Sequence, residues 1–220
     1  MYVYLCVNSV CCSVIDVVFV VYAQSQSAWS QILSFINQIV NRFTIAECAQ
    51  RFSFVSCGNA ANVEFRLNAL NNNQETRQRI QSIRYIGGAN YNLATCLDTV
   101  RNQVFQANAG ARFAAPWVAV IITDRSPTVR QGETPSIAAQ LRTAGIQIIP
   151  VGVTSGQLDR NFLNQIAFLQ TRVTTVNSYG QLSSVAAQIG DYICNSHLSK
   201  SRDTFVNACA SESVNYSQPK

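Results

Sequence analysis

The chain has 220 residues, 48% of them hydrophobic and only 12% charged, which suits one domain with a sizeable core and excludes a disordered chain. Its net charge of +5 reflects few acids rather than a Lys/Arg-rich run, so nucleic-acid binding is not expected, although a mildly basic surface would favour acidic polysaccharide. The single histidine, His197, leaves Ser/His/Asp and Cys/His catalysis and multi-histidine metal sites almost nothing to build on.

The N-terminal stretch Met1–Ala23 is mostly apolar and ends in small residues, so it has some of the character of a signal peptide. It lacks a positively charged start, however, and carries Asp16 inside the apolar run. We interpret Asp16–Tyr22 as the central strand of a parallel sheet, since it is a continuous β-branched and aromatic run. On this interpretation a leader is absent from the chain and no membrane span is expected.

A helix is predicted over Trp29–Phe43, where apolar residues recur at helical spacing. The next two strands, Arg51–Cys57 and Val63–Leu67, are separated by five residues, which suits a hairpin. The remaining pattern alternates helices and strands: helix Gln74–Ile83, helix Leu93–Asn108, strand Trp117–Thr123, helix Thr134–Ala144, strand Ile146–Val153, helix Leu158–Leu169, strand Arg172–Val176 and helix Tyr179–Ile193. This order predicts an α/β fold: a doubly wound, mostly parallel six-stranded sheet with one antiparallel edge strand and helices on both faces.

Three segments follow from the composition. Residues 1–15 form a cysteine-containing extension, residues 16–194 form the domain, and residues 195–220 form a polar tail or linker. The eight cysteines include no paired CxxC motif, so disulfides are a better interpretation than zinc ligands. Disulfides indicate an oxidising compartment, and the Asn215–Ser217 sequon is a weak signal of the same kind, so we expect a secreted protein.

Six segments in order resemble a von Willebrand factor type A domain, particularly those of matrix proteins such as matrilins, collagen VI and invertebrate thread or shell-matrix proteins. They are DVVFVV, SFVSCGNAANVEFRL, YIGGANYNLATCL, WVAVIITD, LRTAGIQIIPVGV and VNSYGQLSSVAAQI. The resemblance implies a Rossmann-like fold and a non-enzymatic adhesion module of the extracellular matrix. Its family site is a metal-ion-dependent adhesion site, made by D-x-S-x-S after the first strand, a threonine in a GG-x-T-x-T-G loop, and an aspartate ending the central strand.

The first part of that site falls on Tyr22, Gln24 and Gln26, where the family has Asp, Ser and Ser. A phenol with a pKa near 10 is neutral at pH 7, and the two long amides replace compact hydroxyls. Shifting the frame by one residue recovers Ser25 but still leaves no carboxylate. In the second part of the site, Asn90 stands where the family has the loop threonine.

Asp124 is the only acid of the family site that this sequence keeps, and Arg125 follows it where glycine is usual. We expect Arg125 to pair with Asp124 and lower its need for a metal. A hard dication requires several oxygen ligands with negative charge, so the sequence predicts a degenerate site with no metal and no cofactor.

Two interpretations of these positions remain open. In the first, Tyr22 fills the space of the missing ion and Asp124 only caps a turn. In the second, a polar and aromatic contact face binds a ligand without metal, and its residues are Tyr22, Gln24, Ser25, Gln26, Asn90, Asp124 and Arg125.

The resemblance also bears on the cysteines. It places the start of the first strand and the end of the last helix together, so Cys11 or Cys12 is expected to meet Cys194. Cys57 and Cys96 are either bonded near the ligand-binding edge or merely buried. Spacing cannot assign the others, which are Cys6, Cys48, Cys209 and the spare member of the Cys11/Cys12 pair; tail cysteines can link chains into disulfide-linked or homotypic assemblies.

Two functions are carried forward. The first is metal-independent binding of matrix partners, either collagen-like proteins or acidic or structural polysaccharides. The second is a disulfide-tethered scaffold or spacer in a matrix assembly. A nucleotide-dependent enzyme or a hydrolase is not expected, because the chain lacks G-x-G-x-x-G after the first strand, the P-loop motif and G-x-S-x-G.

Overall fold

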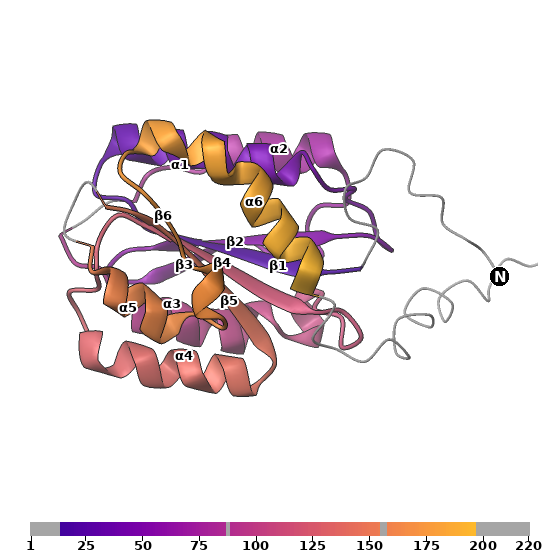
Figure 1. Ribbon diagram of the computed structural model, residues 1–220. Coiled ribbons are helices and arrows are strands. Elements are labelled where there is room, and N and C mark those ends of the chain that lie inside the picture. Colours follow the sequence, from indigo (N-terminus) through magenta and orange to yellow (C-terminus); the bar gives the residue numbers. More distant parts are fainter. Residues whose placement is uncertain (1–13, 87–88, 155–157, 197–220) are drawn as a thin grey trace, which may run out of the picture.

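The structure is a computed structural model that describes residues 14–86, 89–154 and 158–196. A six-stranded sheet runs through its centre in the order β3-β2-β1-β4-β5-β6 (Figure 1). All neighbours are parallel except β2 and β3, which pair antiparallel at one edge. The strands are β1 (Asp16–Val21), β2 (Arg51–Cys57), β3 (Ala61–Phe65), β4 (Trp117–Thr123), β5 (Ile146–Val153) and β6 (Thr174–Val176). The predicted fold class is therefore confirmed.

The strand β1 lies in the middle of the sheet, with β2 on one side and β4 on the other. All six of its residues are buried, which explains why its sequence is an apolar run rather than an alternation. Its first residue, Asp16, is wholly buried and forms an ion pair with Arg112. The interpretation of this segment as a central strand is confirmed, and the acid that argued against a signal peptide has a structural partner.

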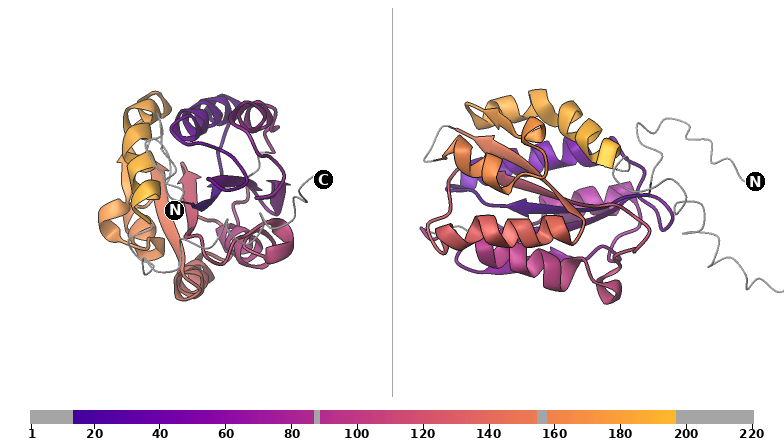
Figure 2. Two further views of the ribbon diagram at one scale, coloured as in Figure 1. Left: turned by 90° about the vertical axis from the view of Figure 1, so that its right-hand side faces the viewer. Right: turned by 60° about the horizontal axis from the view of Figure 1, so that its bottom comes forward.

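Helices cover both faces of the sheet, and Figure 2 shows the two helical layers from two further directions. One layer holds α1 (Gln26–Val40), α2 (Asn73–Gln81) and α6 (Leu182–Cys194). The other holds α3 (Leu93–Thr99), α4 (Thr134–Thr143) and α5 (Arg160–Ile166). Each layer encloses its own cluster of buried apolar residues, because successive side chains of a strand point to opposite faces.

The predicted helix over residues 93–108 is broken into three pieces. After α3 the chain forms a π-helical turn at Val100–Val104 and a 3₁₀ turn at Ala107–Ala109. The turn ends at Gly110, whose φ of 87° is left-handed and whose Cα approaches Asn68 closely. Apolar periodicity alone did not show this break, because π and α turns bury the same side of the chain here.

Other boundaries shift by a few residues. The β3 strand begins at Ala61 rather than Val63, because a hydrogen bond from the Gly58 amide to the Ala60 carbonyl, 3.0 Å, closes a shorter turn. A bulge between Phe54 and Val55 absorbs the resulting change of register. The last predicted helix starts with a 3₁₀ turn at Tyr179–Gln181 before α6, and α5 is shorter than predicted.

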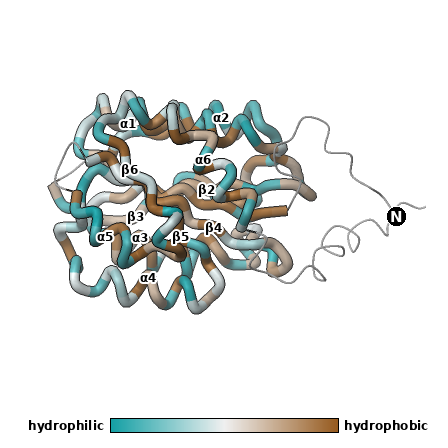
Figure 3. Tube along the Cα trace, in the orientation of Figure 1, coloured by the Kyte–Doolittle hydropathy of each residue, from teal (hydrophilic) through white to brown (hydrophobic). Residues whose placement is uncertain are grey.

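Hydropathy follows this layering: the strands are largely hydrophobic, and the helices alternate between hydrophobic and hydrophilic residues (Figure 3). Within the described residues, no helix has both the length and the apolar character needed to cross a bilayer.

Candidate functional site

The carboxyl ends of the parallel strands all lie at the same end of the sheet, at the left in Figure 1. We call the loops at this edge the crown. It comprises Tyr22–Ser25 after β1, the described residues of 84–92 before α3, Asp124–Val129 after β4, and Asn177–Tyr179 after β6. Ligands of open α/β sheets bind at this edge, so the crown is the place to look for a site.

Asp124 lies at the centre of the crown and is only 2% exposed. Its Oδ2 atom accepts a hydrogen bond from the backbone amide of Gln24 at 2.9 Å and a short one from the Tyr179 hydroxyl. Its Oδ1 atom is buried and has no hydrogen-bond partner in the part of the chain that the structure describes. Burial raises the pKa of the Asp124 carboxyl, and the hydrogen bonds from Tyr179 and Gln24 oppose that shift.

Four tyrosines surround this carboxylate, and we call them the tyrosine cluster: Tyr22, Tyr85, Tyr91 and Tyr179. The rings of Tyr22 and Tyr91 stack with their centroids 4.1 Å apart, and each residue is 1% exposed. Burial raises the pKa of Tyr91, and burial together with the hydrogen bond to Asp124 raises that of Tyr179. Both phenols are therefore neutral at pH 7, and the stacked rings pack the interior directly beneath the crown.

Tyr22 thus differs from its predicted role in a contact face. A side chain that is 1% exposed does not touch a ligand at the surface, and Tyr22 supports the crown from below. Its ring fills space at the position where the family has an ion-binding aspartate, which is the first of the two interpretations of this residue. The apolar surroundings of β1 favour a buried ring there over an exposed one.

The other loop residues lie at the surface. Gln24, Gln26 and Asn90 are exposed. Ser25 is also exposed, and its hydroxyl accepts a hydrogen bond from the Ala28 amide at 3.2 Å, so it caps the start of α1. The crown therefore presents amides from two separate loops, while its one serine at this position stabilises a helix.

The predicted ion pair between Arg125 and Asp124 does not form within the described part of the chain, although the positive charge of Arg125 opposes the rise in the pKa of that carboxyl. The Arg125 Nη1 atom donates to the Ala89 carbonyl at 3.3 Å, and its backbone amide and carbonyl both contact the Thr123 hydroxyl. Tyr179 takes the place beside Asp124 that we assigned to the arginine. Arg125 is half-buried and links the loop after β4 to the loop before α3.

A hard divalent cation does not fit these residues. It would require several negative oxygens in near-octahedral geometry, and the crown offers one carboxylate whose Oδ2 already accepts two hydrogen bonds. The stacked rings of Tyr22 and Tyr91 occupy the adjoining space. Over residues 14–86, 89–154 and 158–196 there is no group of three His, Cys, Asp or Glu side chains that could hold a metal.

Sequence reasoning missed Tyr85, Tyr91 and Tyr179 as neighbours of Asp124. Tyr179 is 55 residues from Asp124 in the chain, so only the fold brings their side chains together. The available signal was the presence of tyrosine in three of the four crown loops: the loop after β1, the loop before α3 and the loop after β6. A tyrosine in the aspartate position could have prompted a search for further tyrosines in the other crown loops.

The cysteines divide into two groups. Cys57 and Cys96 form a disulfide with a Cα–Cα distance of 6.1 Å, which joins the end of β2 to α3 near the crown. Cys48, just before β2, is also disulfide-bonded. Cys194 is half-buried at the end of α6 and carries a thiol, so the structure does not support its expected bond to Cys11 or Cys12. The remaining predictions concern positions outside the described residues: Cys6, Cys11, Cys12, Cys209, His197 and the Asn215 sequon.

Comparisons with known proteins bear on this geometry. A family model, the von Willebrand factor type A domain, matches residues 16–188. Matrilin-3 of Mus musculus is 25% identical over 187 residues, which cover 82% of this chain and 38% of matrilin-3. The human collagen alpha-6(VI) chain is 24% identical over 161 residues, which cover 73% of this chain and 7% of the collagen chain.

Among solved structures, proximal thread matrix protein 1 from the mussel byssus matches with a TM-score of 0.78 at 22% identity, over 84% of this chain and 49% of that one. Another structure of the mussel protein, described as having a zinc-occupied MIDAS motif, matches with a TM-score of 0.78 at 20% identity. MIDAS denotes the metal-ion-dependent adhesion site. At this identity the likeness shows a shared fold, and the chain spans less than half the length of each of these relatives.

Proposed function

The chain belongs to the von Willebrand factor type A domain family, and we propose that it is a non-enzymatic module of the extracellular matrix whose crown binds matrix partners without a metal ion. The family and the resemblance to matrilin-3, collagen VI and the mussel thread matrix protein support a matrix role. The Cys57–Cys96 disulfide supports secretion into an oxidising compartment.

The environment of Asp124 is the observation that supports binding without a metal ion. Its Oδ2 atom already accepts hydrogen bonds from the Tyr179 hydroxyl and the backbone amide of Gln24. The buried ring of Tyr22 stands at the position of the family aspartate. A ligand at the crown would therefore meet the exposed amides of Gln24, Gln26 and Asn90 and the guanidinium of Arg125. Such groups recognise polar protein surfaces, including collagen-like ones, and the charge of Arg125 also suits acidic polysaccharide.

The test is solid-phase binding of the full chain to collagens, chitin and sulfated glycans, with and without EDTA. We expect saturable binding to at least one of them that EDTA leaves unchanged. The double variant Gln24→Ala/Asn90→Ala should weaken that binding while keeping the melting temperature, because both side chains are exposed on the crown. Binding that EDTA abolishes, or binding that the variant leaves intact, would contradict the proposal.

A second candidate function is a disulfide-tethered scaffold or spacer in a matrix assembly. It is favoured by Cys48, which is disulfide-bonded at the end of the sheet opposite the crown. In this proposal residues 1–15 and 195–220 are linking segments around the domain of residues 16–194. Failure to bind any partner in the screen, together with reductant-sensitive dimers or ladders on gels, would favour the scaffold over the binding module.

A further inference from the structure

The outer surfaces of α1 and α6 are dominated by uncharged polar side chains. Every side chain of α1 that is not buried is an amide or a hydroxyl: Gln26, Ser27, Ser30, Gln31, Ser34, Asn37 and Gln38. The exposed side of α6 adds Ser183, Ser184 and Gln188, with Asp191 as its one acid. Surface helices usually carry charged residues on this side, so the composition itself is unusual.

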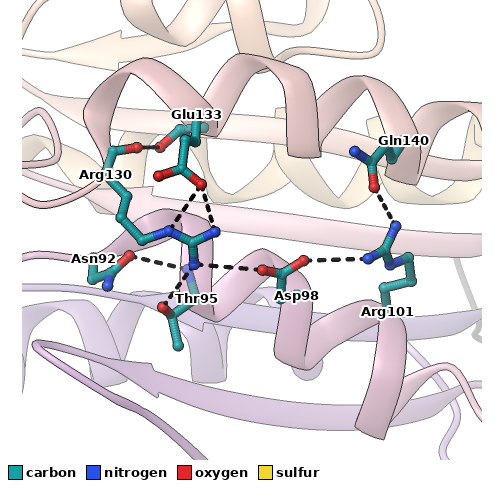
Figure 4. Close-up of polar contacts among 8 residues, drawn as sticks. Asn92, Thr95, Asp98, Arg101, Arg130, Glu133 and Gln140 are labelled. Atoms are coloured by element: carbon teal, nitrogen blue, oxygen red, sulfur yellow. Dashed lines mark hydrogen bonds and ion pairs between the residues drawn. The ribbon is translucent and has the colours of Figure 1, made fainter.

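The opposite layer is built differently. There Arg130 forms ion pairs with Asp98 and Glu133, and Arg101 pairs with Asp98 (Figure 4). These pairs join α3 and its π-helical continuation to the start of α4. On the α1, α2 and α6 side, by contrast, neutral hydrogen-bonding groups cover α1, and the charged residues Glu75, Arg77 and Arg79 lie on α2.

A groove with a volume of about 650 Å³ lies between α1 and α2. This volume falls within the range of about 300–1,000 Å³ that small-ligand sites occupy. Its lining residues share polar, mostly uncharged side chains: Asn37, Gln74, Arg77, Gln78, Gln81 and Ser82. No carboxylate and no aromatic ring lines the groove.

The groups in the groove retain hydrogen-bonding capacity. Gln74, Gln78 and Gln81 are exposed, and their side chains make no hydrogen bond within the described part of the chain. The Oδ1 atom of Asn37 is buried and likewise accepts none there, while its Nδ2 atom donates to the Arg77 carbonyl at 3.4 Å. A buried acceptor without a partner costs free energy that a donor from a ligand would recover.

We propose that this groove binds a neutral, hydroxyl-rich glycan chain. Each side-chain amide offers two donors and an acceptor, and each sugar hydroxyl both donates and accepts, so the two surfaces match group for group. A peptide would need apolar anchor pockets, which the groove lacks. The single positive charge belongs to Arg77, whose Nη1 atom already donates to Asn41 Oδ1 at 3.0 Å, so an anionic ligand finds no cluster of cations.

The test uses the full chain, labelled with ¹⁵N and titrated with the neutral hexasaccharides chitohexaose and cellohexaose. We expect saturable shifts of the Gln74, Gln78 and Gln81 side-chain amide signals that do not depend on salt concentration, because no charge on the ligand is screened. The variant Gln74→Ala/Gln78→Ala should weaken binding about tenfold, as expected for the loss of two ordinary hydrogen bonds.

The matched control is Asn102→Ala/Gln103→Ala, which removes two exposed amides from the opposite face and should leave binding unchanged. Absence of saturation with both hexasaccharides, or shifts confined to the crown, would overturn the proposal. Binding of a heparin hexasaccharide alone, with an affinity that falls as salt is added, would overturn it too by showing an anion site. The crown proposal is tested separately, because its variant changes crown side chains, whereas the groove variant changes side chains of α2.

Discussion

At the scale of single residues, Asp124 shows how the fold has replaced an ion site with a hydrogen-bonded carboxylate. Burial raises the folded-state pKa of Asp124 above that of the unfolded chain, which lies near 4. The native state then binds the proton more tightly than the unfolded state does. The stability that Asp124 contributes is therefore fully present below the unfolded pKa and is lost as the pH rises through the folded pKa.

This predicts the behaviour of Asp124→Asn, in which the side chain cannot ionise. The free energy of unfolding of the parent, relative to that of the variant, should fall as the pH rises above about 4, the pKa of the unfolded chain, and through the raised pKa of the folded state. Urea unfolding at a series of pH values measures this difference, and Glu75→Gln on the exposed side of α2 serves as the control for loss of a carboxylate. A difference that grows with pH would show that the fold stabilises the charged form of Asp124.

Arg112 gives a second prediction at this scale. Its Nε atom and its backbone amide donate to the fully buried Asp16 carboxylate at 2.9 Å and 2.7 Å. Arg112→Met would leave that carboxylate buried without its cation, at a cost of about 3–5 kcal/mol in the free energy of unfolding. Arg101→Met, which removes a partly exposed ion pair with Asp98, should cost about 1 kcal/mol or less. Chemical denaturation compares the two, and equal losses would contradict the burial argument.

At the scale of elements, substitutions at two glycines with positive φ distinguish the cost of backbone strain from the cost of steric contact. Gly110 has φ 87°, and an added Cβ would lie 2.5 Å from the Cβ of Asn68. Gly145 has φ 83°, with nothing within 4 Å of an added Cβ. Both lie at the ends of helical segments, where left-handed residues are common.

Alanine at Gly145 should cost about 1–2 kcal/mol, which is the penalty of the left-handed conformation alone. Alanine at Gly110 should cost clearly more, because the chain that ends the π-helical region must also move away from Asn68. Thermal and urea unfolding of the two variants measure the difference. Equal losses would mean that the contact with Asn68 yields without resistance.

The same elements show what sequence patterns can and cannot predict. The strands β1, β4 and β5 were predictable because each is a mostly apolar segment rich in Val and Ile that the sheet buries on both faces. The π-helical break after α3 was not, because its apolar spacing resembles that of an α-helix over so few residues. The position of the crown and its single acid, Asp124, were predictable, but the contact between Tyr179 and Asp124 depends on packing between distant segments.

At the scale of the whole molecule, the sheet and the site follow separate rules. Many buried apolar residues specify the sheet, so it persists at 22% identity to the mussel protein. A few polar residues in loops specify an ion site, and their replacement by tyrosine, glutamine and asparagine leaves the sheet intact. The edge opposite the crown keeps its own chemistry, since the start of β1, the segment before β2 and the end of α6 all lie there.

This arrangement predicts a covalent tie at that edge. The Glu47 carbonyl accepts from Arg112, which also binds Asp16, so Cys48 lies near the start of β1. Because Cys48 is disulfide-bonded and residues 1–15 lead directly into β1, we expect a bond between Cys48 and one of Cys6, Cys11 and Cys12. Closing a long loop in this way would stabilise the fold by about 3–5 kcal/mol in the chain-entropy description.

Peptide mapping by mass spectrometry under non-reducing conditions measures this pairing. The expected product is a peptide from residues 1–15 linked to one that contains Cys48, alongside the Cys57–Cys96 pair as an internal control. Replacing the mapped partner with serine should lower the melting temperature while the Cys57–Cys96 pair remains. A map in which the N-terminal cysteines link only to Cys209 or to other chains would contradict the tie and would favour the scaffold function.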